Sequence, residues 1–178
     1  MKAGKVTILT ALVLVTALAT LGFQKERPPA GEAFVTAANG FLATLDDEEK
    51  KLAVMDYESP ERVGWHFIPK DKRKGLVVKE MNPKQRRAAN QLLRAGLSFL
   101  GYKKFTNIMK LEGVLHELEK ANPGRFPRDT ELYFYTVFGK PAKEGKWGVS
   151  IEGHHMSLNF VIEDGEVISS TFDEPASR

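Results

Sequence analysis

The sequence predicts an α+β fold, in which an antiparallel β-meander is covered by a helical hairpin. Apolar residues recur at helical spacing over residues 82–101 and again over residues 103–120. After Asn122-Pro123-Gly124 the apolar spacing changes to the period of two that is typical of strands. Because the helical segments precede a run of strands and do not alternate with it, we expect an antiparallel sheet with helices on one face.

The first helix is expected over residues 32–45, where Phe34, Ala37, Phe41 and Leu45 recur at the spacing of one helical face. A second, short helix is expected over residues 46–55.

A helical hairpin is expected next. Asn82-Pro83-Lys84-Gln85 combines a capping asparagine, a proline at the first helical position and a glutamine that can reach back to the cap. This helix is predicted to end at Gly101. A helix over residues 103–120 should follow after a very short link and pack antiparallel on it.

Strands are expected in two places. Aromatic and β-branched residues around a lysine-rich turn favour a short hairpin of strands over residues 62–78. The meander itself is expected as four strands punctuated by glycine-containing turns, over residues 131–138, 146–152, 155–162 and 166–172.

The N-terminus has the pattern of a secretory signal. Lys2 and Lys5 precede an apolar run over residues 6–23, and cleavage is expected after Ala19. The alternative is an uncleaved anchor ending at residue 23, although that run is near the lower limit of roughly 17–25 residues for a membrane span. We therefore expect a signal at 1–19, a linker at 20–31, one domain at 32–172 and a tail at 173–178.

Export limits the available chemistry. The protein should be periplasmic or extracellular, and it should contact the membrane only if residues 6–23 remain attached. The chain contains no cysteine, which excludes disulfides, thiolate metal sites and cysteine nucleophiles. Its formal charge of +3 includes two lysines of the signal, and no basic stripe with interleaved aromatic residues is visible, so we expect no nucleic-acid partner.

The most informative stretch is Glu152-Gly153-His154-His155-Met156-Ser157-Leu158-Asn159-Phe160. On a strand, Met156, Leu158 and Phe160 would point to the core. His155, Ser157 and Asn159 would then share the opposite face.

Three chemical interpretations of this stretch remain open beside a purely structural one. In the first, His154 and His155 bind a divalent metal with Glu152 or Asn159, which requires a kink at Gly153 because adjacent residues of a regular strand point to opposite faces. His66 or His116 could complete such a site.

In the second interpretation, His155 acts as a base towards Ser157 or an activated water. Two residues on one strand face are roughly 6–7 Å apart, however, which is too long for a direct hydrogen bond. In the third, the stretch is a surface for a small polar ligand, oriented by Trp147, Tyr133 or Tyr135 from neighbouring strands.

Glu112 is a separate candidate. It lies on the apolar side of the helix predicted over residues 103–120. It is therefore expected to be either a partly buried carboxylate with a raised pKa or the partner of an arginine.

Motifs spread over the domain resemble one family of exported bacterial proteins, the domain-of-unknown-function family thirty-five hundred. They include Arg62-x-x-Trp65-x-Phe67-x-Pro69, Arg73-Lys74-Gly75-Leu76, Trp147-Gly148 and, most specifically, Gly153-His154-His155-Met156-Ser157-Leu158-Asn159. The resemblance spans about residues 32–172. It implies a shared site that draws on Arg62, Trp65, Arg73, Trp147, His154, His155, Ser157 and Asn159.

The resemblance implies no particular activity. It does imply that family members continue with a further, mainly helical half, so that this chain is expected to be a shortened member or a truncated reading frame. Our leading interpretation is an exported protein whose histidine-containing site binds a divalent metal or a small polar ligand. The alternatives are an extracytoplasmic hydrolase that uses His155 and a module that binds a cell-envelope component.

Overall fold

The computed structural model describes residues 30–122, 124, 126 and 128–173. The expected signal over residues 1–19, its anchor alternative, most of the expected linker and residues 174–178 of the expected tail lie outside these ranges. Within them, no helix is both long enough and apolar enough to cross a membrane.

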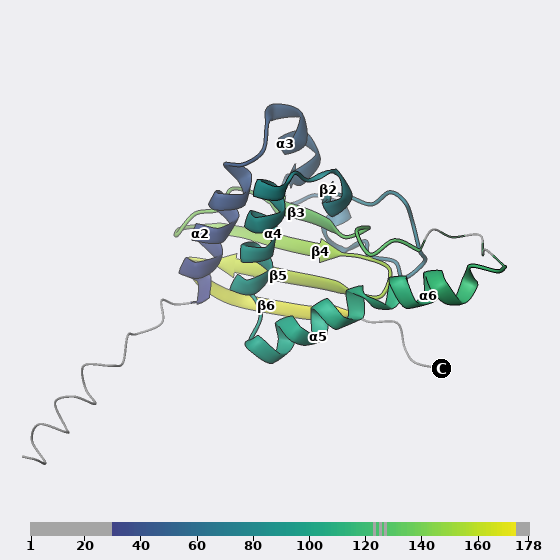
Figure 1. The fold of residues 1–178 in the computed structure, drawn as a ribbon. Helices are drawn as coiled ribbons and strands as arrows, with labels where there is room; N and C mark the ends of the chain where they lie inside the picture. The colour runs from purple at the N-terminus through teal and green to yellow at the C-terminus, as the bar shows by residue number, and fades with distance from the viewer. Residues whose placement is uncertain (1–29, 123, 125, 127, 174–178) are drawn as a thin grey trace, which may run out of the picture.

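The described strands form one mixed sheet (Figure 1), and its main part is the expected antiparallel meander. The strands of the meander are β3 (Phe134–Phe138), β4 (Lys146–Glu152), β5 (Ser157–Glu163) and β6 (Glu166–Asp173). Two short strands share the free edge of β3. β1 (Val54–Met55) runs parallel to it and β2 (Leu76–Val77) runs antiparallel. The α+β class is confirmed.

Two helices lie side by side across one face of the sheet (Figure 1), α2 (Ala30–Leu42) and α4 (Pro83–Ala95). The apolar side of α2 reaches the sheet through aromatic pairs, with ring centroids 4.8 Å apart for Phe34 and Phe160 and 5.9 Å apart for Phe41 and Tyr135. The helical pair on the sheet is therefore α2 with α4, not the expected pair over residues 82–101 and 103–120.

Capping residues explain where the helices begin and end. Asn82 accepts hydrogen bonds from the first turn of α4 and Gln85 reaches back to the Asn82 N–H, as expected from the sequence. Asp46 caps α3 (Asp47–Ala53) in the same way. The expected helix end at Gly101 is wrong, because α4 ends at Ala95 and the hydroxyl of Ser98 caps a new helix.

That new helix is α5 (Phe99–Met109), and α6 (Leu111–Glu119) follows directly. The expected single helix over residues 103–120 is therefore divided at Lys110. Figure 1 shows α5 beside β6, and α6 at the end of the sheet where β4 turns into β5. This position lets α6 reach the turn between β4 and β5.

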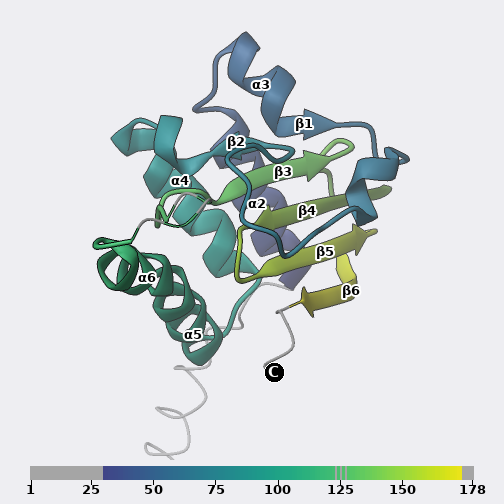
Figure 2. The same cartoon turned by 90° about the vertical axis from the view of Figure 1, so that its right-hand side faces the viewer.

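The opposite face of the sheet is crossed by residues 56–75 (Figure 2), which are irregular apart from a short 3-10 helix at Pro60–Val63. The expected strand hairpin over residues 62–78 is wrong, since only Leu76–Val77 pairs with the sheet. The guanidinium of Arg73 donates to the carbonyls of His66 and Ile68 at 2.8 Å each. Side-chain hydrogen bonds thus replace the ladder that a hairpin would supply.

A buried ion pair fixes this segment to the sheet. Lys74 donates to Glu152 at the end of β4, and the two side chains are only 4% and 3% exposed. Ser150 donates to the same carboxylate oxygen at 2.9 Å. The pair compensates two charges that would otherwise be costly to bury.

Removing one member of the pair should destabilise the fold. We expect Glu152→Gln to lower the free energy of unfolding by about 3–5 kcal/mol, because the Lys74 ammonium stays buried without its counter-charge. The matched control is Glu163→Gln, which breaks the exposed pair with Lys146 and should cost less than about 1 kcal/mol. Urea unfolding measures both, and equal losses would contradict the account.

Candidate functional site

Glu112 is the buried charge at the centre of the site. It lies in the first turn of α6, and its side chain is 3% exposed. The carboxylate faces the turn of residues 153–156 that joins β4 to β5, where it meets both histidines of the sequence motif.

The turn brings the two histidines to one side. Gly153 donates its N–H to the carbonyl of Met156 at 2.8 Å, which closes the turn before β5 begins at Ser157. A Cβ atom on Gly153 would lie 2.5 Å from a ring carbon of Tyr133, so the position accepts only glycine. The kink that a metal site requires is therefore present, and the imidazole centroids of His154 and His155 are 4.1 Å apart.

Both imidazoles contact the same carboxylate oxygen. His154 Nδ1 hydrogen-bonds to Glu112 Oε1, and His155 Nε2 lies 3.1 Å from it. Burial raises the pKa of Glu112, but hydrogen bonding and the positive charge of the two histidines outweigh it and lower the pKa from 4.5 to about 2. The carboxylate is thus ionised over the physiological range, contrary to the raised pKa that burial alone suggests.

An arginine lies behind Glu112, as expected from the alternative in which this carboxylate is the partner of an arginine. Arg128 Nη1 lies 3.8 Å from Glu112 Oε2. The same guanidinium donates twice to Glu119, with both distances 2.9 Å. This bidentate pair holds Arg128 in place beside Glu112.

Buried polar atoms without a hydrogen-bond partner gather at this point. Among the described residues they include Glu112 Oε2, His155 Nε2, Arg128 Nη1 and the hydroxyl of Tyr133. Burial and the nearby Glu112 charge raise the pKa of Tyr133, which keeps its hydroxyl protonated and able to donate. Because buried polar atoms are nearly always paired, this concentration indicates a place for a bound ion or water.

The space and the donor atoms fit a single small ion. A cavity of about 10 Å³ is bordered by Glu112, Tyr133 and His154, which is close to the volume one water centre needs. One donor atom each from Glu112, His154 and His155 lies within 4.8 Å of the others. Ligands of a tetrahedral zinc ion at roughly 2.0–2.2 Å stand roughly 3.5 Å apart, so an ion needs only small side-chain movements.

The remaining predicted site residues fall elsewhere. Glu152, expected as a metal ligand, pairs with Lys74. Ser157 accepts a hydrogen bond from Asn159 at 2.9 Å, while His155 contacts Glu112. Trp147 is fully buried in the core and donates to the carbonyl of Ala142 at 3.1 Å. It therefore does not border the site around Glu112.

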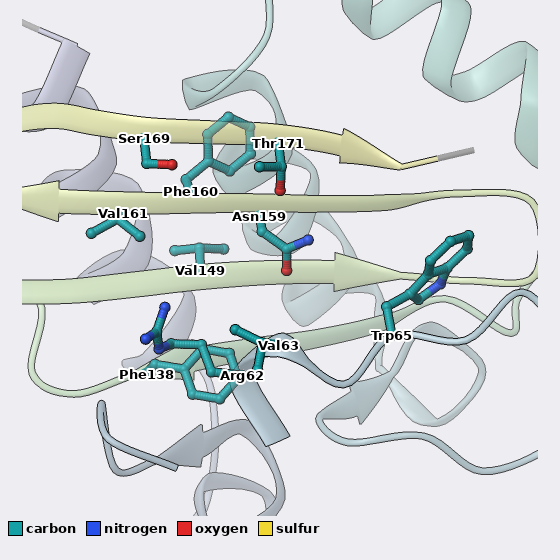
Figure 3. A pocket seen from close by; sticks show the side chains of 10 residues that line it. All are labelled: Arg62, Val63, Trp65, Phe138, Val149, Asn159, Phe160, Val161, Ser169 and Thr171. Carbon is teal, nitrogen blue, oxygen red and sulfur yellow. The ribbon is translucent and has the colours of Figure 1, made fainter. Parts of the chain in front are cut away.

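Three of the predicted ligand-binding residues do come together, in a different place. Arg62, Trp65 and Asn159 border a pocket between the residue 56–75 segment and the sheet (Figure 3). Arg73 borders a neighbouring hollow with Lys74 and Glu152. The single shared site implied by the family resemblance is therefore divided among separate places.

Comparison with known proteins identifies the family. No curated protein and no solved structure matches the chain. A family model described as "Protein of unknown function (DUF3500)" matches residues 29–173. This span includes every residue of the site around Glu112 and of the pocket bordered by Arg62. The chain belongs to the DUF3500 family.

Proposed function

We propose that this is an exported protein that binds a divalent transition-metal ion through Glu112, His154 and His155. The observation that carries the proposal is the convergence of two imidazoles on one buried, ionised carboxylate, surrounded by polar atoms without partners. Imidazole and carboxylate ligands suit zinc, iron and copper. The ion would replace the proton through which His154 Nδ1 meets Glu112 Oε1, so that binding releases a proton.

The surroundings favour a site with one open coordination position. Arg128 orients the carboxylate from outside, as second-layer groups do in metal sites. The Tyr133 hydroxyl is a buried donor at the same cavity, and it can hold a water or a small polar ligand on the ion. The side chains of His154 and His155 are 20% and 19% exposed, so the ion has a path to solvent.

Export is the part of the proposal that rests on the sequence alone. Two lysines, an apolar run over residues 6–23 and Ala17-Leu18-Ala19 support a signal. A site built from histidine and carboxylate fits a compartment in which thiolates would be oxidised.

The metal-free chain should bind one equivalent of zinc in a calorimetric titration. We expect His154→Ala and His155→Ala each to weaken binding by more than roughly 100-fold, because the loss of a second-layer partner alone costs roughly 10–100-fold. The control is His116→Ala, which removes an exposed histidine from the same helix as Glu112 and should leave the affinity unchanged. Zinc uptake that survives both motif variants would contradict the proposal.

The metal-free protein should also show a specific acid sensitivity. The pKa of Glu112 is depressed on folding, so its contribution to stability is complete above pH 4.5 and is lost as the pH falls towards 2. A shift from 4.5 to about 2 corresponds to about 3 kcal/mol. Urea unfolding of the wild type and Glu112→Gln at pH 5 and pH 2.5 measures this. The stability difference between the two proteins should shrink at the lower pH, and a constant difference would show that the charge of Glu112 contributes nothing.

A further inference from the structure

We infer a second binding site, for a small organic acid that carries hydroxyl groups, such as a sugar acid. It is the pocket of about 270 Å³ between the residue 56–75 segment and the outer face of the sheet (Figure 3). Typical pockets for drug-sized ligands begin at roughly 300 Å³, so this one suits a single ring or a short chain.

The charge of the pocket points to an anion. Arg62 is the one charged residue of its lining, and this guanidinium forms no ion pair within the described part of the chain. Arg62 Nε donates to the carbonyl of Tyr57 at 3.0 Å, and its guanidinium carbon lies 4.5 Å from the centre of the Tyr57 ring. These contacts hold the side chain in place and leave the terminal nitrogens to bind a carboxylate, which matches the guanidinium fork.

The strands supply groups for hydroxyl recognition. Asn159 uses its amide nitrogen on Ser157, but its carbonyl oxygen is buried without a donor. Thr171 is the cross-strand partner of Asn159 on β6, so the two side chains share a face of the sheet. Ser169 follows on the same face opposite Val161 (Figure 3). Ligand hydroxyls can thus donate to the carbonyl oxygen of Asn159, and they can donate to or accept from the hydroxyls of Ser169 and Thr171.

Aromatic side chains supply the apolar part of the pocket. Phe138 is almost completely buried, and Trp65 is held by a hydrogen bond from its indole nitrogen to the carbonyl of Gly153 at 3.1 Å. Rigid aromatic surfaces beside hydroxyl and amide groups pack well against the C–H face of a sugar ring. Together with Arg62, these groups favour a sugar acid, bound as its carboxylate, over a neutral sugar.

The test compares galacturonate with its neutral counterpart galactose on the dialysed, metal-free chain. Tryptophan fluorescence reports the pocket directly, since the chain has two tryptophans and Trp147 is sealed in the core. We expect saturable binding of galacturonate and at least roughly 10-fold weaker binding of galactose, because a charge-assisted pair is lost.

Arg62→Gln should weaken galacturonate binding by roughly 10- to 100-fold. The matched control is Arg94→Gln. The guanidinium carbon of Arg94 also lies over a tyrosine ring, 3.9 Å from the centre of the Tyr102 ring, but Arg94 does not border the pocket. Thr171→Val removes an exposed hydroxyl without disturbing Arg62 and should weaken galacturonate binding several-fold. This second variant tests the pocket even if Arg62→Gln does not fold.

The inference would be overturned by no saturable galacturonate binding, by galactose binding of equal strength, or by galacturonate binding that is unchanged in both Arg62→Gln and Thr171→Val. Inorganic phosphate that competes as tightly as galacturonate would also overturn it, because an anion site alone would then explain the signal. None of these results depends on the metal proposal, which concerns other residues.

Discussion

The structure depends on one buried carboxylate, that of Glu112. A buried charge without partners is unfavourable by several kcal/mol, so its position on α6 requires cationic or hydrogen-bonding groups from elsewhere in the fold. The turn between β4 and β5 supplies His154 and His155 to one carboxylate oxygen, and Arg128 lies near the other. The same contacts join α6 to the sheet and orient two imidazoles towards one point. Fold stability and candidate function therefore rest on the same atoms.

The residue 56–75 segment connects this centre with the second pocket. Trp65 borders the pocket and also donates to the carbonyl of Gly153, the residue before His154. Lys74, near the C-terminal end of the segment, is buried against Glu152, the residue before Gly153. The segment is thus attached at two consecutive residues immediately before the histidines. The Trp65 indole therefore joins the lining of the pocket to the turn that carries the histidines through one hydrogen bond.

Much of the architecture could be predicted from periodicity and capping, and less of the site. The meander and the Asn82 cap were predictable because alternation and capping are local properties. Gly101 was misassigned as a helix end because Ser98, three residues earlier, caps a new helix. His154 and His155 were identified, and Glu112 was singled out separately as a buried carboxylate. The contact between them was not predicted, since Glu112 lies 42 residues before His154 and no local pattern tells which turn α6 will meet.

X-ray absorption spectroscopy of the zinc-loaded protein observes the ligands of the bound ion directly. Zinc held by Glu112, His154 and His155 should show a first shell of nitrogen and oxygen at roughly 2.0–2.2 Å with the scattering of two imidazoles. The two-imidazole signal should fall to one in His154→Ala or His155→Ala, and the carboxylate contribution should be lost in Glu112→Ala. A zinc shell without two imidazoles, or one that the three substitutions leave unchanged, would contradict this set of ligands.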